Sequence, residues 1–143
     1  MQDFKQRKGM TVIEILTVLT IVGTLMAIAI PHGQLMLDRI SVHSAAGDLA
    51  MTLSSAREFA LASRFAVAVD FAGPGGALRV RRGSAVLFTR NIASAHGVEL
   101  SQTRDSLAFG PLGLGRGAAN LSIIVRRRAA AETVFVSRLG RIR

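Results

Sequence analysis

Arginine is the residue type whose placement in this sequence could do chemistry. Three pairs stand two positions apart: Arg79 and Arg81, Arg126 and Arg128, and Arg141 and Arg143. Because side chains alternate across an extended strand, the members of each pair would share one face. A guanidinium can hold a phosphate with two parallel hydrogen bonds, so these pairs predict a phosphate-contacting surface without sequence readout. Solvated strand faces and edge-protecting charges are the alternative interpretation.

Residues typical of enzymes and metal sites are present but not grouped. The histidines lack metal-ligand spacing, and the chain has no cysteine. Asp38, Asp48, Glu58 and Asp70 are interpreted as surface charges rather than an acid–base pair. The Gly-rich stretch from Phe109 to Gly117 lacks the Gly-Lys-Ser/Thr ending of a phosphate-binding loop. The sequence therefore predicts no enzyme, no metal site and no cofactor.

The charge of the chain is strongly positive and unevenly distributed. The chain has 143 residues, enough for one small domain, with a net charge of +9 and a pI of about 11.8. Lys5, Arg7 and Lys8 precede an apolar segment, and the other 15 cations of 18 are arginines beyond Asp38. A basic surface attracts nucleic acid or other anionic polymers. A GC-rich genome would also explain the richness in arginine.

The apolar segment is long enough for a membrane helix. Ile15 to Leu37 carries no charge over 23 residues, and a spanning helix needs ~20. The basic residues before it predict that this end stays in the cytoplasm and that the rest is exported. Three interpretations compete: a signal peptide removed after Ala27-Ile28-Ala29, a plain membrane anchor, or a leader cut before the apolar run.

Glu14 bears on that choice. A carboxylate costs roughly 2.5–3.5 kcal/mol at mid-helix in a membrane, and a signal peptide gains nothing from it. Either Glu14 lies at the membrane interface, or it pairs with a positive group inside an apolar bundle. The free N-terminus of a neighbouring subunit would be such a group. Further along, Pro31 and Gly33 predict that the helix kinks or melts locally, or that a membrane helix ends there.

The stretch Gly9-Met10-Thr11-Val12-Ile13-Glu14 behind a short basic leader resembles the type IV prepilin cleavage motif. The resemblance implies that a prepilin peptidase cuts after Gly9 and that Met10 becomes the methylated first residue, where the family usually has Phe. It also implies that Glu14 pairs with a neighbouring subunit's new N-terminus. Pro31 falls on the proline that bends the family's long helix.

The remaining chain predicts one more helix and then strands. Residues 38–63 carry an apolar stripe at helical spacing, formed by Ile40, Val42, Leu49, Leu53, Ala56, Ala60 and Leu61. Phe65 to Phe71 alternates as a strand does, and Gly73-Pro74-Gly75-Gly76 indicates the turn of a hairpin. Further strands are expected at Leu78–Arg82, Ala85–Arg90, Val98–Ser101, Leu121–Arg127 and Thr133–Val136. The fold class is α+β: a long N-terminal helix, its first half in the membrane, packed on a small antiparallel sheet domain.

Two short stretches resemble the GspH/FimT branch of pilin-like proteins: Phe109 to Gly113, and the last ten residues from Val134. The tail Gly140-Arg141-Ile142-Arg143 matches a Gly-Arg-x-Arg ending of FimT-type minor pilins, a group tied to DNA uptake. The resemblance implies DNA binding by Arg141 and Arg143. We extend the predicted surface to Gly140, Arg138, Arg126 and Arg128.

These observations predict a leader at residues 1–9, a transmembrane and filament-core helix at 10–37, and a globular domain at 38–143. Within that domain we expect a helix at 38–63 and a β-domain at 64–143. The predicted function is that of a minor type IV pilin that enters a pilus and binds DNA without sequence preference. Its partners would be other pilin subunits, the prepilin peptidase, DNA and the inner membrane, with the C-terminal domain in the periplasm. The alternatives are a GspH-like pseudopilin of type II secretion and a secreted basic soluble domain.

Overall fold

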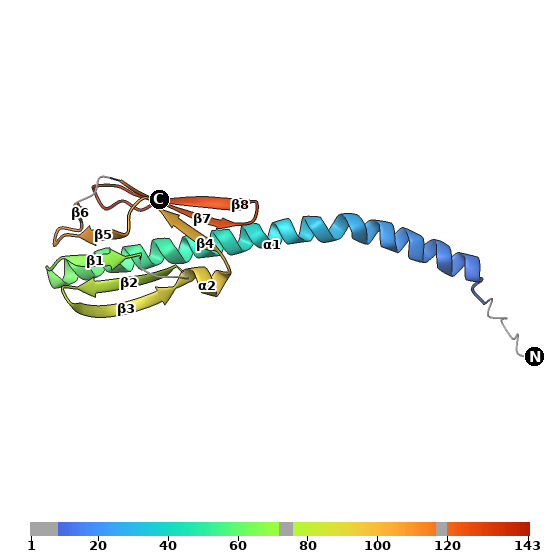
Figure 1. Ribbon diagram of the computed structural model, residues 1–143, viewed down its shortest axis with the longest axis horizontal. Coiled ribbons are helices and arrows are strands. Elements are labelled where there is room, and N and C mark those ends of the chain that lie inside the picture. The colour runs from blue at the N-terminus through green and yellow to red at the C-terminus, as the bar shows by residue number, and fades with distance from the viewer. Residues whose placement is uncertain (1–8, 72–75, 117–119) are drawn as a thin grey trace, which may run out of the picture. The chain divides into compact units, whose positions relative to one another are not determined.

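The computed structural model describes residues 9–71, 76–116 and 120–143. The expected leader up to Lys8, turn residues Gly73–Gly75 and Gly117 lie outside these ranges. The chain divides into two compact units, Met1–Leu35 and Met36–Arg143. One helix, α1 (Val12–Ser63), belongs to both units (Figure 1). In its described residues, the second unit adds a short helix and eight strands: β1 (Val67–Asp70), β2 (Ala77–Arg82), β3 (Ala85–Asn91), α2 (Ile92–His96), β4 (Glu99–Gln102), β5 (Ser106–Phe109), β6 (Gly115–Arg116), β7 (Leu121–Arg127) and β8 (Ala130–Val136).

The first turn of α1 is closed by a reciprocal pair of hydrogen bonds. The Glu14 N–H donates to Thr11 Oγ1 at 3.3 Å, and the Thr11 N–H donates to Glu14 Oε2 at 3.4 Å. This is a capping box, which satisfies two backbone donors that a helix start leaves without partners. Glu14 therefore has a local role that the sequence interpretation missed, although Thr-x-x-Glu is its signature.

The part of α1 that belongs to the first unit is an exposed apolar helix. It contains an 18-residue window that is long and apolar enough to cross a membrane, and none of that window is buried inside the structure. The helix runs on through Pro31, so the prediction of a local melt and the alternative of a helix end there are both wrong. The ring of His32 bonds the helix backbone through Nδ1, 2.8 Å from the carbonyl oxygen of Ile28.

In the second unit α1 buries one face. Val42, Ala45, Leu49, Leu53, Ala56 and Ala60 are buried at helical spacing, as the apolar stripe predicted. Ile40 and Leu61 are exposed, so their place in that stripe was wrong. Ile40 falls on the side of the helix opposite the buried face, and Leu61 falls well to one side of that face. Small alanines on the buried face let the strands approach the helix closely.

The strands form two antiparallel sheets, where the sequence interpretation expected one sheet. The first has the order β3-β2-β1-β5-β6, and the second β4-β7-β8. The β1–β2 hairpin and the span of β7 are confirmed, with Ala68 opposite Arg81 and Leu121 opposite Val136. The strands β5 and β6 and the helix α2 were not predicted.

Both sheets share a single apolar core with α1. Figure 1 shows the second half of α1 running alongside β1 and β2 and alongside β7 and β8. Fully buried side chains come from all three layers, among them Leu49, Phe109 and Ile123. Truncating such a residue to alanine costs about 2–5 kcal/mol. The predicted α+β fold, a long N-terminal helix packed on an antiparallel sheet domain, is confirmed.

Candidate nucleic-acid interface

The last residues fold back along β8 as an extra edge segment. The N–H of Phe135 donates to the Arg143 carbonyl at 2.8 Å, and the Arg143 N–H donates to the Phe135 carbonyl at 2.9 Å. The Ser137 N–H donates to the Arg141 carbonyl at 2.9 Å. Ile142 packs against the core, whereas Arg141 and Arg143 are exposed. The extended tail thus places both arginines on one face.

Gly140 makes the turn that this tail requires. Its φ is +72°, and a Cβ at this position would lie 2.1 Å from the carbonyl oxygen of Gly113. Arg57, on α1, donates from Nε to that same oxygen at 3.0 Å, and the Gly115 N–H donates to the Arg138 carbonyl at 2.9 Å. The tail therefore packs against the Gly-rich stretch, and glycine at position 140 allows the backbones of these two segments to approach closely.

Arg128 is used elsewhere in the fold. It lies in the two-residue turn between β7 and β8 with φ +49°, and its guanidinium bonds both oxygens of Asp38 at 3.3 and 3.4 Å. Arg127 Nε lies 2.9 Å from Asp38 Oδ1. Asp38 is 2% exposed, so its prediction as a surface charge is wrong. A carboxylate this deeply buried needs such partners, and it ties α1 to the β7–β8 turn.

Arg81 is also committed to a structural pair. Its Nε lies 2.5 Å from Asp70 Oδ2, and its other nitrogen donates to Oδ1 at 3.3 Å. Hydrogen bonding to Asp70, together with the attraction to its negative charge, raises the pKa of Arg81 above its ordinary value. The pair Arg79 and Arg81 therefore carries less free positive charge than its sequence implies.

Arg126 lies on the same sheet face as the tail arginines but at a distance along it. Ser122 is opposite Phe135, and Phe135 in turn exchanges hydrogen bonds with Arg143, so these three side chains share the outer face. Arg126 follows Ser122 by four residues on β7, which is about 13 Å along a strand. The structure thus brings only part of the predicted surface together. Arg141 and Arg143 lie side by side, and Arg138 is exposed in the adjoining turn. Arg126 is farther away on the same face, and Arg128 lies in the β7–β8 turn, bonded to Asp38.

A groove of about 590 Å³ runs beside the tail arginines. We call it the tail groove; its lining residues are Asn120, Ser122, Phe135, Val136, Ser137, Leu139, Arg141 and Arg143. Among the described residues, no aspartate or glutamate side chain lines it. Within the described ranges, the side chains of Arg141 and Arg143 make no hydrogen bond or ion pair. The tail groove is therefore positive and open to an anionic ligand.

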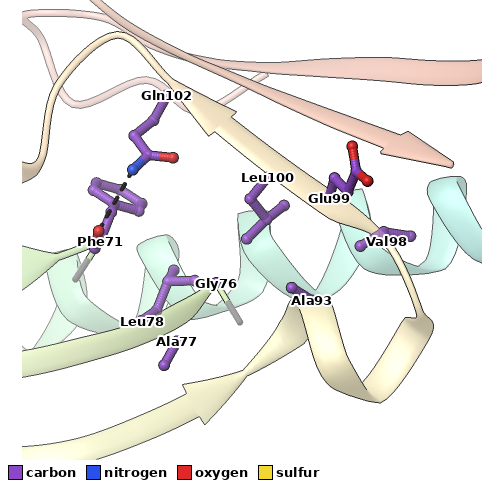
Figure 2. A pocket seen from close by; sticks show the side chains of 9 residues that line it. All are labelled: Phe71, Gly76, Ala77, Leu78, Ala93, Val98, Glu99, Leu100 and Gln102. Carbon is purple, nitrogen blue, oxygen red and sulfur yellow. Dashed lines mark hydrogen bonds between the residues drawn. The ribbon is translucent and has the colours of Figure 1, made fainter. Parts of the chain in front are cut away.

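A second hollow lies between the two sheets. It measures about 280 Å³, and Figure 2 shows Leu100 of β4 pointing toward Gly76 and Leu78 across it. Its wall is mainly apolar, with one hydrogen bond from Gln102 Nε2 to the Phe71 carbonyl at 3.4 Å. The one carboxylate on its rim, Glu99, turns away from the hollow (Figure 2). Such a lining offers no set of converging polar groups for catalysis.

No group of three or more metal-ligating side chains occurs among the residues that the structure describes. His96 and Asp48 instead form a pair between α2 and α1, with Nε2 2.6 Å from Oδ2. Sequence reasoning missed the exposed apolar side chains of the tail groove, Phe135 and Leu139. The alternation on β8 could have placed Phe135 on the outer face, but the hydrogen bonding of the tail had no signal in the sequence.

Solved structures of one protein are similar to this chain. A crystal structure of the type IV minor pilin FimU of Pseudomonas aeruginosa strain PAO1 matches with a TM-score of 0.65 and 20% identity, over 76% of this chain and 90% of that chain. A second crystal form of FimU matches with a TM-score of 0.61 and 18% identity, over 71% and 90%. No protein-family model matches the sequence, and no curated protein sequence does. The chain thus has a type IV pilin-like fold.

Proposed function

We propose that this chain is a minor type IV pilin that enters a pilus and holds DNA at its C-terminal arginine pair. The likeness to FimU, itself described as a type IV minor pilin, supports the first half of the proposal. The exposed apolar helix supports an anchor in the inner membrane before assembly and contacts with other pilin subunits afterwards. The C-terminal domain then lies in the periplasm, as the basic leader predicts.

Processing between Gly9 and Met10 belongs to the same proposal. A Cβ on Gly9 would meet no atom within 4 Å, and its φ is not in the left-handed region. Nothing in the part of the chain that the structure describes therefore requires glycine at position 9. A requirement set by a prepilin peptidase accounts for the residue, and Glu14 and Pro31 keep their proposed roles in assembly.

One observation carries the DNA half of the proposal: Arg141 and Arg143 are exposed side by side, without acidic partners in the described chain, along a groove without aspartate or glutamate. Such arginines can contact successive phosphates, and contacts of this kind give affinity without sequence preference. Arg138 adds a further charge at the adjoining turn.

The test is the salt dependence of DNA binding by the full chain in detergent micelles, measured by fluorescence anisotropy with short labelled duplexes of different sequence. Each phosphate contact contributes a slope of about −0.9 in log affinity against log salt. Arg141→Gln with Arg143→Gln should make the slope shallower by up to about 2 and weaken all sequences alike. Glutamine keeps polarity and most of the length.

The matched control is Arg79→Gln with Arg104→Gln. Both arginines are exposed, and neither side chain makes a hydrogen bond or ion pair within the described ranges, so the change in net charge is the same. If both double variants weaken binding equally, the effect is general electrostatics and the tail is not a site. A wild-type chain that binds no DNA at low salt would remove the DNA half of the proposal.

A further inference from the structure

Among the phenylalanines in the described ranges, Phe135 combines an exposed ring with the absence of any aromatic or cation–π contact to that ring. Phe71 and Phe109 are buried. Phe59 pairs with Phe88 at 6.1 Å between ring centroids, and the Arg82 guanidinium lies 5.8 Å from the centroid of Phe65. Phe135 is 53% exposed, and none of the other described residues makes an aromatic or cation–π contact with it. A free aromatic face on a rigid strand is a surface for stacking.

The position of this ring relative to the arginines is fixed by backbone hydrogen bonds. Phe135 and Arg143 exchange both N–H···O bonds, at 2.8 and 2.9 Å, so their side chains lie directly opposite on one face. On its other side Phe135 faces Ser122, a small residue that leaves the ring standing clear. All three line the tail groove.

The tail groove therefore presents two kinds of contact side by side. Arg141 and Arg143 supply positive charge, and Phe135 with the 65% exposed Leu139 supplies apolar surface. A ligand that matches both must carry anionic groups alternating with flat apolar rings. A single-stranded nucleic acid has that chemistry, because each unpaired base offers a free π-face beside its phosphate. In a duplex the base faces are stacked inside, and the groove would meet only sugars and phosphates.

We propose that the tail groove prefers single-stranded DNA, with Phe135 stacking on an unpaired base while Arg141 and Arg143 hold the flanking phosphates. This inference rests on the proposed DNA-binding function and specifies its substrate. Leu139 borders the base on the side of the turn that Gly140 makes. The groove volume of about 590 Å³ lies within the ~300–1,000 Å³ typical of ligand sites.

The experiment compares a labelled twelve-nucleotide oligo-dT with a twelve-base-pair duplex, using the full chain in detergent micelles at low salt. Phe135→Ala should weaken oligo-dT binding by about 5- to 150-fold, the range for loss of one stacking contact. Duplex binding should change less than about 2-fold, which also shows that the tail still presents its arginines. Phe135→Tyr keeps an aromatic ring, so it should retain most of the oligo-dT affinity that Phe135→Ala loses.

The matched control is Phe65→Ala, which removes another exposed phenylalanine beside an arginine. Phe65 is 62% exposed, with Arg82 over one face of its ring, and it lies outside the tail groove, so oligo-dT binding should not change. The salt slope should be the same for wild type and Phe135→Ala, because no phosphate contact is lost.

Four results would overturn the inference, and they separate it from the proposed function. If Arg141→Gln with Arg143→Gln weakens binding but Phe135→Ala does not, DNA binding stands and stacking does not. If Phe135→Ala weakens the binding of oligo-dT and of duplex equally, Phe135 maintains the shape of the tail and does not stack on a base. If Phe135→Ala leaves DNA binding intact and instead reduces incorporation into filaments, the groove receives another subunit. If the wild type binds neither DNA, the proposed function itself fails.

Discussion

The carbonyl oxygen of Gly113 occupies the space that a side chain on Gly140 would need, with only 2.1 Å between that oxygen and an added Cβ. Gly140→Ala should therefore push the tail away from the Gly-rich loop and off β8. Hydrogen exchange measures this directly: protection of the Phe135 and Arg143 amides, which bond each other's carbonyls, should fall, while that of Ile123 in the core should persist.

Gly83→Ala is the control for backbone strain alone. Gly83 also has a positive φ, +61°, but a Cβ there would meet no atom within 4 Å. Its cost should be about 1–3 kcal/mol of strain, with the tail amides still protected. If Gly140→Ala leaves the amides of Phe135 and Arg143 as protected as Gly83→Ala does, the contact with Gly113 does not position the tail.

Glu14 has two candidate roles that a pair of substitutions can separate. Glu14→Gln keeps an acceptor for the capping box with Thr11 but removes the charge, whereas Glu14→Ala removes both. If Glu14 pairs with a neighbouring subunit's N-terminus, both variants should insert into the membrane and both should be poorly incorporated into filaments. Quantitative immunoblotting of membrane and sheared-pilus fractions measures the two steps. Normal incorporation of Glu14→Gln alone would assign Glu14 to helix capping.

Gly9→Val tests the processing site. Because a side chain at position 9 has open space within this chain, the fold should not change. A peptidase that requires glycine before the cut should leave this variant at its precursor length. Gly23→Val, also in open space but inside α1, serves as the control and should be processed. N-terminal sequencing of mature wild-type protein should begin at Met10; a start at Ile30 would instead indicate signal-peptide removal.

Asp38→Ala should destabilise the second unit. It deletes a buried carboxylate and leaves Arg127 and Arg128 without it. Loss of one partner in a fully buried pair costs about 3–5 kcal/mol, and we expect about 1–3 here because both guanidiniums reach water. Glu58→Gln, on an exposed part of the same helix, should change stability by less than about 0.5 kcal/mol. Proteolysis of the full chain in detergent across a urea series would compare them, and equal midpoints would contradict a stabilising role for Asp38.

The sequence predicted well wherever a pattern was local. The alternation of Leu121, Ile123 and Val125 placed β7 at its observed limits, because one face of that strand meets the core. The helical stripe from Val42 to Ala60 was correct for the same reason. In the candidate site, the two-residue spacing placed Arg141 and Arg143 on one face because the tail is extended along β8. The same spacing failed for Arg126 and Arg128, since Arg128 lies in the turn after β7.

What the sequence could not predict depends on contacts between distant residues. Strand β5 pairs with β1, where Val67 lies opposite Phe109, so nothing near Ser106 signals the strand. Asp38 resembles a surface residue until the β7–β8 turn brings two guanidiniums to it. In the same way, the packing of Gly140 against Gly113 brings the Gly-rich loop and the C-terminal tail together. Their two short motifs are separate in the sequence and gave no sign of this contact.

The burial of Asp38 also determines where the chain can be shortened for study in water. The apolar half of α1 must be removed for a soluble fragment, and the charge pattern invites a cut just before Arg39. Such a fragment loses the carboxylate that Arg127 and Arg128 enclose. A fragment that begins at Met36, the first residue of the second unit, retains it. Two exposed apolar residues, Met36 and Leu37, then remain at its new amino terminus, where polar substitutions would disturb nothing buried.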